Sequence, residues 1–279
     1  MFRLSGFFAA LALLAPPQII LMHVPRWRFI LPRVFFRFML ALLSVRVSVT
    51  GPLPETASET GQKSGTLLVA NHVSWFDVAL IGAILPVTFM AKSEVKAWPL
   101  FGQLAWLNNT LFVTRRIGRH TLHETNALSA RLVRGEIVVL FAEGTSSDGL
   151  RVLPFKSSFF AVCEGDKGTT IAVQAMSLAY MRRHNMALGR RQRMAYGWIG
   201  DMTLLPHFVK IFAGPPLGVD LLFHPAVPHE QAPDRKTLAR TLHWQVSQGL
   251  DAISGGAPHP VSHSLSQSHP QSMPDGQRP

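Results

Sequence analysis

Apolar residues along the chain form short continuous runs separated by polar stretches, a pattern typical of buried strands that alternate with helices. Strands are predicted at residues 46–50, 66–70, 88–92, 110–114, 138–141, 170–179 and 217–223. Helices are predicted between them and after the last strand, at residues 75–82, 98–107, 118–134 and 233–253. Strands that alternate with helices in this way predict an α/β sandwich.

Two longer apolar runs precede the first strand, at residues 4–22 and 29–45. Pro16-Pro17 is expected to interrupt the first run, and the second helix is expected to start at or just before Pro32, since proline is tolerated in a helix only in its first turn. A spanning helix needs about 20 apolar residues. The first run barely reaches that length, and the second is shortened by Pro32.

Arginines within the second run also bear on its relation to a membrane. Arg33 and Arg37 lie about one turn apart, and each would cost about 2.5–3.5 kcal/mol at the bilayer centre. Two interfacial or half-inserted helices, with these arginines among phosphate headgroups, are therefore expected rather than two spans. A cleaved signal peptide over residues 1–15 is the alternative. The second apolar helix and the scarcity of cysteine argue against it.

Composition supports a membrane partner. The 279 residues carry 27 Lys and Arg against 16 Asp and Glu, a formal charge of +11, and 47% are hydrophobic. Residues 1–50 hold six arginines and no acid. A basic and apolar chain suits an anionic membrane surface better than nucleic acid, so membrane lipids are the predicted partner and nucleic acid is not. The single cysteine, Cys163, excludes an internal disulfide and provides no cysteine metal cluster.

The same patterns predict three parts of the chain. Residues 1–45 form a membrane-anchoring helix pair, and residues 46–253 form the catalytic α/β domain. From residue 254 the chain is mostly Gly, Pro, Ser, His and Gln, which predicts a disordered tail.

Candidate chemistry begins where the strand at residues 66–70 ends. Asn71-His72 follows it directly, a usual position for functional groups in α/β folds. Asp77 comes five residues later, and five helical steps rotate a side chain by about 140° from its start. The two side chains therefore meet only if His72 precedes the helix and Asp77 lies in its first turn. The aspartate then fixes one imidazole nitrogen and leaves the other as a general base.

A purely structural interpretation of this stretch also exists. Ser74-x-x-Asp77 resembles a capping box, so Asp77 can serve the helix end alone and His72 can be a hydrogen-bonded turn histidine. The two interpretations remain open at this point.

Polar residues also follow two other predicted strands. Arg115 comes after residues 110–114, and Glu143-Gly144-Thr145 comes after residues 138–141. If the three strands lie side by side, these groups and His72 make one polar pocket at one edge of the sheet.

Taken together, Asn71-His72-x-x-x-x-Asp77, Phe112-Val113-x-Arg115 and Phe141-x-Glu143-Gly144-Thr145 resemble the motif set of the glycerolipid acyltransferases. The nearest members are the bacterial lysophosphatidic acid acyltransferases. The likeness covers roughly residues 45–225, and the apolar N-terminal helices resemble that family's membrane anchor. It implies a mixed sheet flanked by helices, preceded by a membrane-associated two-helix segment.

The resemblance also implies roles for residues. His72 is the general base and Asp77 its orienter, Arg115 holds the acceptor's phosphate, and Glu143, Gly144 and Thr145 help to bind the acceptor. The implied reaction moves a fatty acyl group from acyl-CoA or acyl carrier protein to a lysophospholipid hydroxyl, with no cofactor and no metal. The expected acceptor is 1-acyl-sn-glycerol 3-phosphate, which becomes phosphatidic acid. The implied location is the bacterial inner membrane, with the catalytic domain on its cytoplasmic face.

Four positions depart from the family pattern. Asn109 stands where the family's second motif opens with glycine. Ala142 and Ser146 stand where the third motif has a proline before its glutamate and an arginine after its threonine. A fourth motif of the family contains a proline, and Ala175 stands at that position. The missing arginine removes a bidentate phosphate ligand, and Lys156 or Arg151 is the candidate replacement. The stretch from Glu143 to Lys156 is similar to lyso-ornithine lipid acyltransferases, so that lipid is the alternative acceptor.

Two other enzyme classes fit less well. A serine hydrolase needs a Gly-x-Ser-x-Gly turn, and residues 144–148 lack the second glycine. A thiol enzyme would need a reactive Cys163, but this residue follows an apolar stretch and is expected to be a small core residue. Backbone N–H groups at the start of the helix after His72 are candidate donors for the oxyanion of acyl transfer.

Overall fold

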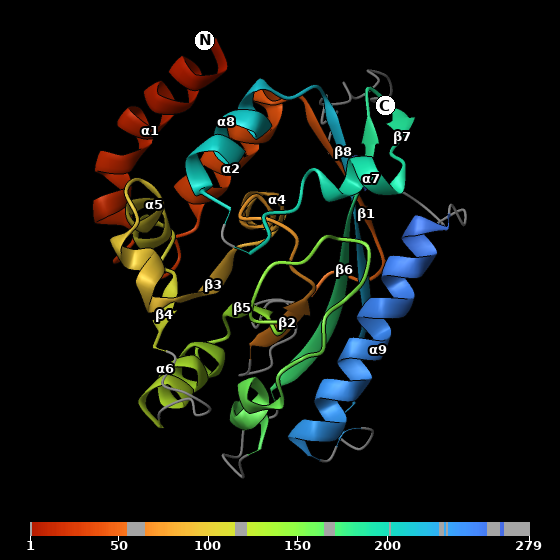
Figure 1. The fold of residues 1–279 in the computed structure, drawn as a ribbon. Helices are drawn as coiled ribbons and strands as arrows, with labels where there is room; N and C mark the ends of the chain where they lie inside the picture. The colour runs from red at the N-terminus through yellow and green to blue at the C-terminus, as the bar shows by residue number, and fades with distance from the viewer. Residues whose placement is uncertain are drawn as a thin grey trace, which may run out of the picture.

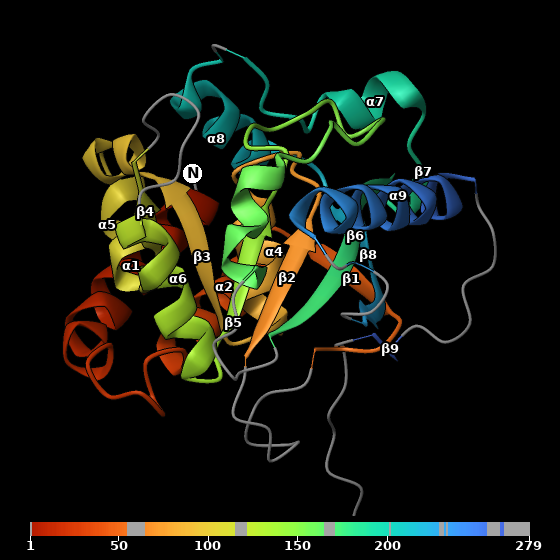
Figure 2. The same cartoon turned by 90° about the horizontal axis from the view of Figure 1, so that it is seen from below.

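The computed structural model describes residues 2–54, 65–114, 122–164, 171–200, 202–228, 232, 234–255 and 263–264, without the side chains of 122–124 and 263–264. Within these residues the strands form one nine-stranded mixed sheet in the order β4-β3-β5-β2-β6-β8-β1-β9, with β7 paired to β6. Figure 2 shows this sheet and the helices around it. The strands are β1 (Val45–Thr50), β2 (Thr66–Ala70), β3 (Val87–Lys92), β4 (Leu111–Val113), β5 (Ile137–Phe141), β6 (Ala172–Arg183), β7 (Met186–Ala187), β8 (Leu217–Val227) and β9 (His263–Ser264).

Strand direction determines where the candidate residues lie. From β4 through β3, β5 and β2 to β6, neighbouring strands are parallel. β8 runs antiparallel to β6 and parallel to β1. The last residues of β2 and β5, Ala70 and Phe141, pair with each other. The residues that follow them therefore emerge side by side at one edge of the sheet.

Helices cover both faces of the sheet (Figure 1). One core is formed with α1 (Phe2–Leu21), α2 (Ile30–Leu42), α4 (Asp77–Ile84) and α8 (Leu204–Ala213). The other core is formed with α6 (Leu122–Val133), the 3₁₀ helix η2 (Ser157–Cys163) and α9 (Arg235–Ser254). The remaining helices are η1 (Ser93–Ala97), α5 (Phe101–Leu107) and α7 (Arg190–Met194). The predicted α/β class, with a mixed sheet flanked by helices, is confirmed.

The prediction that prolines interrupt the first apolar run is wrong. α1 is continuous from Phe2 to Leu21 with Pro16 and Pro17 inside it. Prolines weaken a helix by removing N–H donors, but tertiary contacts hold this end: the Gln18 amide donates to the carbonyls of Arg28 (2.9 Å) and Leu107 (2.8 Å). By length and composition α1 suits a membrane span, and only 11% of its apolar window is buried. Whether the helices lie in the interface stays a prediction.

The second helix begins where its proline predicts, and its two arginines donate hydrogen bonds to α4. α2 starts at Ile30, two residues before Pro32. Arg33 donates to the Ile84 carbonyl (2.9 Å) and Arg37 to the Ala83 carbonyl (2.8 Å). Those carbonyls are at the C-terminal end of α4, where helical acceptors lack intrahelical donors. The two arginines therefore cap α4 from α2, and contact with phosphate headgroups stays a prediction.

A buried carboxylate fastens the segment between α1 and α2 to the sheet. Glu136, directly before β5, is 4% exposed. It pairs with Arg28 (2.9 Å), Arg131 (3.2 Å) and Arg134 (3.1 Å) and accepts from the Thr88 hydroxyl (2.8 Å). Burial opposes its charge, but the nearby arginines and hydrogen bonds leave its pKa below the usual value. Three guanidinium groups compensate one buried charge, as a buried ion needs.

Several local features depart from the predicted pattern. β6 and β8 extend beyond the predicted strands, and α7 and α8 are not predicted at all. Asn109 takes a positive φ of 54°, a conformation that glycine adopts freely and asparagine tolerates. Asparagine thus supplies the backbone conformation at the position where the family has glycine. Of the predicted tail, the structure describes Ser254, Gly255 and β9, which pairs with β1.

Candidate active site

His72 and Asp77 meet as the spacing predicts. His72 lies in the turn after β2, and Asp77 is the first residue of α4. The imidazole Nδ1 is 2.9 Å from Asp77 Oδ2. The same oxygen accepts hydrogen bonds from the backbone N–H groups of Val73 (2.7 Å) and Ser74 (2.9 Å). The aspartate therefore caps the start of the helix and orients the imidazole at once, so the two sequence-based interpretations describe one arrangement.

The orientation of the ring leaves its other nitrogen for chemistry. His72 stacks on Phe141 at the end of β5, with ring centroids 4.0 Å apart and an angle of 18° between the planes. Its side chain is 17% exposed, whereas Asp77 is fully buried. Within the described residues, no hydrogen bond engages Nε2. A carboxylate on Nδ1 fixes the tautomer in which Nε2 can accept a proton.

A tyrosine that the sequence does not single out completes the environment of Asp77. Tyr180, on β6, donates its hydroxyl to Asp77 Oδ1 at 2.6 Å. Complete burial and the neighbouring carboxylate raise the phenol pKa well above its usual value, so it stays protonated. Tyr180 also stacks parallel to Tyr196, with ring centroids 5.5 Å apart. Both oxygens of the buried carboxylate are thus hydrogen-bonded, as a buried charge requires.

Glu143 joins the third motif to the histidine turn. Its Oε1 accepts from the backbone N–H of His72 (2.7 Å), and its Oε2 accepts from the backbone N–H of Leu153 (2.9 Å). The residue is 2% exposed. Burial is the main cause that raises its pKa to about 7, and the charge of Asp77 adds to it. The proximity of the β2 and β5 ends is as predicted, and binding of the acceptor by Glu143 stays a prediction.

The loop after Glu143 is held by serine hydroxyls. Ser147 donates to the His72 carbonyl (3.1 Å), and Ser146 donates to the Trp198 carbonyl. The backbone N–H of Trp198 in turn donates to the Val73 carbonyl (2.9 Å). Neither hydroxyl is directed at the imidazole, so the serine-hydrolase alternative gains no support. Burial raises the pKa of Cys163 to about 12, which leaves its thiol protonated and agrees with a core residue.

The other predicted site residues differ in what the structure shows. Gly144 has a positive φ of 72°, which glycine adopts freely. Thr145 is exposed in the same loop, and Lys156 is exposed with its backbone N–H donating to the Ala142 carbonyl (3.0 Å). Arg115 lies outside the described residues, two positions beyond the end of β4.

The predicted oxyanion donors at the helix start are engaged elsewhere. The N–H groups of Val73 and Ser74 donate to Asp77, and that of Phe76 donates to the Ser74 hydroxyl (3.3 Å). The N–H of Asp77 donates to the Ser74 carbonyl (3.0 Å). The expectation is therefore wrong for these four groups, because two of them hold the Asp77 carboxylate and the other two donate to Ser74.

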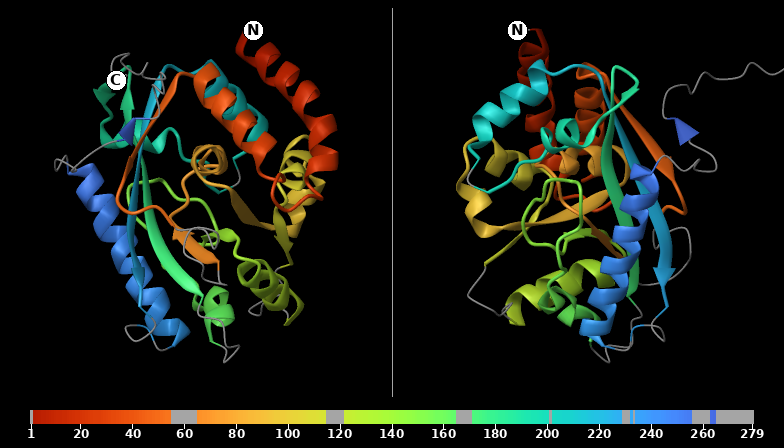
Figure 3. Two further views of the ribbon diagram at one scale, coloured as in Figure 1. Left: turned by 180° about the vertical axis from the view of Figure 1, so that it is seen from behind. Right: turned by 45° about the vertical axis from the view of Figure 1, so that its right-hand side comes forward.

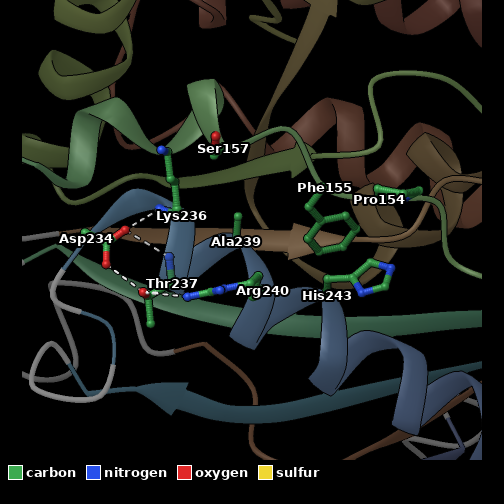
Figure 4. Close-up of a pocket in the computed structure, with 9 residues that line it drawn as sticks. All are labelled: Pro154, Phe155, Ser157, Asp234, Lys236, Thr237, Ala239, Arg240 and His243. Atoms are coloured by element: carbon green, nitrogen blue, oxygen red, sulfur yellow. Dashed lines mark hydrogen bonds between the residues drawn. The ribbon is translucent and has the colours of Figure 1, made fainter.

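A pocket of about 620 Å³ lies on the face of the sheet that α9 covers, between α9 and the segment before η2 (Figure 4). It is lined by Pro154, Phe155, Ser157, Asp234, Lys236, Thr237, Ala239, Arg240 and His243. None of these is a predicted site residue. Asp234 caps α9 there by accepting from the N–H groups of Lys236 (2.8 Å) and Thr237 (3.0 Å). Among the described residues, no group of three or more His, Cys, Asp or Glu side chains has a metal-binding arrangement.

Tyr180→Phe is expected to lower kcat several-fold while the KM values of both substrates stay close to wild type. The variant leaves Asp77 Oδ1 without its donor, at a cost of about 1–3 kcal/mol for a buried acceptor, and loosens the carboxylate that orients His72. Steady-state kinetics and a thermal melt measure both effects. Tyr196→Phe is the matched control, since Tyr196 stacks on Tyr180. Equal effects of the two variants, or a change in KM alone, would show that Tyr180 does not act through Asp77.

Comparison with known proteins agrees with this geometry. Residues 46–176 match the family described as acyltransferase. A lyso-ornithine lipid O-acyltransferase of Brucella abortus is 40% identical over 224 residues, 79% of this chain and 81% of that protein. A 1-acyl-sn-glycerol-3-phosphate acyltransferase of Neisseria meningitidis is 34% identical over 176 residues, 63% of this chain and 64% of that protein.

A solved structure shares the fold. The crystal structure of the 1-acyl-sn-glycerophosphate acyltransferase PlsC from Thermotoga maritima superposes with a TM-score of 0.61 and covers 90% of this chain and 95% of that chain. The two are 19% identical, so the likeness concerns the fold. The sequence relatives show that the chain belongs to the acyltransferase family and is a lipid O-acyltransferase.

Proposed function

We propose that His72 is the general base of an acyl transfer from a thioester to the hydroxyl of a membrane lysolipid. The observation that carries this proposal is the geometry of His72: Asp77 holds Nδ1 at 2.9 Å, and the partly exposed ring leaves Nε2 for a substrate. A positioned base of this kind supplies about 10²–10⁴ in rate.

The reaction balances with this one base. Nε2 takes the proton from the acceptor hydroxyl while its oxygen attacks the thioester carbonyl carbon. The carbon–sulfur bond then breaks, the acyl group stays on the acceptor oxygen, and the imidazolium returns the proton to the leaving thiolate. The Asp77 carboxylate stabilises the imidazolium between these steps. No metal and no covalent enzyme intermediate takes part, and the donor is acyl-CoA or acyl carrier protein.

Two acceptors are each favoured by an observation. 1-Acyl-sn-glycerol 3-phosphate is favoured by the second motif, whose Arg115 provides a fork for a phosphate. A lyso-ornithine lipid is favoured by the third motif, where Ser146 replaces the usual arginine and its hydroxyl fastens the loop to Trp198. Relatives with both names match the chain, as described above.

A parallel assay separates the acceptors. Membranes containing the purified full chain receive lysophosphatidate or lyso-ornithine lipid, each with labelled acyl-CoA or labelled acyl carrier protein. Transfer to one acceptor at a kcat/KM at least about tenfold higher assigns the head group, equivalent to about 1.4 kcal/mol of discrimination. Transfer to neither acceptor from either donor would contradict the proposed reaction.

Arg115→Lys is expected to raise the KM of the acceptor several-fold and to leave kcat nearly unchanged. Lysine keeps the charge but loses the bidentate fork that a phosphate or carboxylate accepts. Steady-state kinetics at saturating donor measure this, with Arg116→Ala as the control that should change little. If Arg115→Ala leaves KM unchanged while Arg151→Ala or Lys156→Ala raises it, the head-group site lies with the third-motif loop.

Membrane association follows from the apolar α1 and from bacterial lipid-acyltransferase relatives. We further propose that the membrane is the bacterial inner membrane, with the catalytic domain on the cytoplasmic face where acyl thioesters are made. Protease protection in spheroplasts and in inverted vesicles tests this: digestion of the catalytic domain from the outside of intact spheroplasts would contradict it.

A further inference from the structure

Helix α8 and the segment before it expose apolar side chains although the rest of α8 is core. Its inner side buries His207, Phe208, Ile211 and Phe212. Its outer side exposes Leu205 by 71% and Val209 by 45%, and the preceding segment exposes Ile199 and Met202 by 37% and 44%. Leu205 and Val209 are four positions apart and so lie on the same side of the helix, and apolar exposure of this kind on a folded protein marks an interaction surface. We define these four exposed residues as the α8 surface.

The helix that carries the α8 surface packs against α1. Phe7 of α1 packs edge-on against Phe208 and Phe212, with ring centroids 5.5 and 5.1 Å apart. The Arg3 guanidinium donates to the carbonyls of Phe212 (3.2 Å) and Gly214 (2.5 Å) at the C-terminal end of α8. The two helices lie together at one end of the molecule (Figure 3). α1 itself exposes several large apolar side chains, including Phe2, Phe8, Leu13 and Ile20.

Basic residues adjoin this end of α8. Lys210 donates to the Ala195 carbonyl (2.6 Å), at the C-terminal end of α7. α7 carries the exposed Arg190 and Arg191, and residues 181–198 contain no acidic side chain. An apolar surface beside basic residues is complementary to a bilayer with anionic lipids, which attract each basic group by about 1 kcal/mol. The local excess of positive charge would favour binding of a second protein chain only if that chain were acidic.

Hydrogen bonds connect α8 and the segment before it to the turn of His72 at two points. The Trp75 indole donates to His207 Nδ1 at 2.9 Å. The backbone N–H of Trp198 donates to the Val73 carbonyl at 2.9 Å. Accepting from the indole requires His207 Nδ1 to be unprotonated, in agreement with burial that lowers the pKa of this histidine. Val73 and Trp75 both lie between His72 and Asp77 in the sequence. A surface that docks at this point therefore fixes the position of the turn relative to what it docks on.

We propose that the α8 surface inserts into an anionic lipid bilayer as a second membrane contact, beside α1, and holds the turn of His72 at the bilayer interface. The lysolipid hydroxyl then reaches Nε2 without its acyl chain leaving the membrane. This inference rests on the proposed function in one respect, that the acceptor is a membrane lipid. The surface itself is assigned from exposure, charge and packing.

The test compares exposed apolar side chains on two helices, α8 and α9, that lie at different places in the fold. Leu205→Asp with Val209→Asp alters the α8 surface, and Trp244→Asp alters α9, where Trp244 is 64% exposed. The full chain and both variants are sedimented with vesicles of phosphatidylglycerol and phosphatidylcholine, or of phosphatidylcholine alone. Transfer is measured with long-chain lysolipid in vesicles and with a short-chain, water-soluble lysolipid. Thermal melts verify folding, and Leu205→Ser with Val209→Ser replaces the double variant if it is unfolded.

The expected result is selective. The double variant Leu205→Asp with Val209→Asp replaces two apolar side chains that insert into the bilayer. It should therefore reduce binding to anionic vesicles, and kcat/KM for the acceptor in vesicles, at least about tenfold. Transfer to the soluble acceptor should stay within about twofold, and Trp244→Asp should change neither quantity. Unchanged vesicle binding, an equal loss with the soluble acceptor, or a wild-type dimer that the variant abolishes would overturn the proposal. The sedimentation arm gives its answer even if no lysolipid is acylated, so failure of the proposed function is seen separately.

Discussion

His72→Ala is expected to lower kcat at least about 100-fold, the minimum contribution of a positioned general base, while the protein stays folded. The imidazole stacks on Phe141 and is partly exposed, so its removal opens no large core cavity. Asp77 keeps its two backbone donors and the Tyr180 hydroxyl, which preserves the helix start. Single-turnover acyl transfer with saturating donor measures the chemical step.

A second histidine provides the control for that experiment. His184 is exposed in the turn between β6 and β7, and its φ of 50° is one that asparagine tolerates. His184→Asn should therefore retain wild-type turnover. A His72→Ala enzyme that works within about tenfold of wild type would exclude the general-base role, since that loss is below what proton transfer supplies.

Asp77→Asn is expected to lower kcat by about 100-fold or more with little change in fold. The amide oxygen can take the place of Oδ2 and accept from His72 Nδ1, Val73 and Ser74, while the NH₂ group donates to the Tyr180 oxygen. Geometry is thus preserved, but the negative charge that stabilises the imidazolium is lost. The measurement is kcat against a thermal melt on the same preparation.

The matched control for Asp77 is Asp148→Asn. Asp148 is a carboxylate of the third-motif loop whose Oδ1 accepts from the backbone N–H of Leu150 (2.9 Å). It makes the same kind of capping contact without touching the imidazole. If Asp77→Asn loses stability in proportion to its loss of turnover, or if both variants lose turnover equally, Asp77 acts as a helix cap and not as the orienter of His72.

Local chemistry explains which parts were predictable from the sequence. The strand at residues 66–70 matches β2, since a short apolar run bounded by polar residues leaves few alternatives. The His72–Asp77 contact follows from helix geometry over five residues. The meeting of His72 with Glu143 follows from parallel strands whose ends share one edge, which the Ala70–Phe141 pairing confirms.

Contacts between distant residues explain what was not predictable. Tyr180 reaches Asp77 from 103 positions away, and nothing near Tyr180 in the sequence indicates it. Arg33 and Arg37 donate to carbonyls at the end of α4, a contact that no local pattern in the sequence indicates. Pro16 and Pro17 break an isolated helix, but Gln18 anchors this one through tertiary hydrogen bonds. In each case tertiary structure overrides a sound local rule.

The docking of α1 and α2 also sets an order of events during synthesis. These helices are made before the rest of the described chain, yet Phe7 packs on Phe208 and Phe212, and Arg3 donates to Gly214, residues that are made about two hundred positions later. Arg28 likewise forms its ion pair only after Glu136 has been made. The side of α1 that carries Phe7 therefore lacks its partners on α8 until most of the described chain has been made.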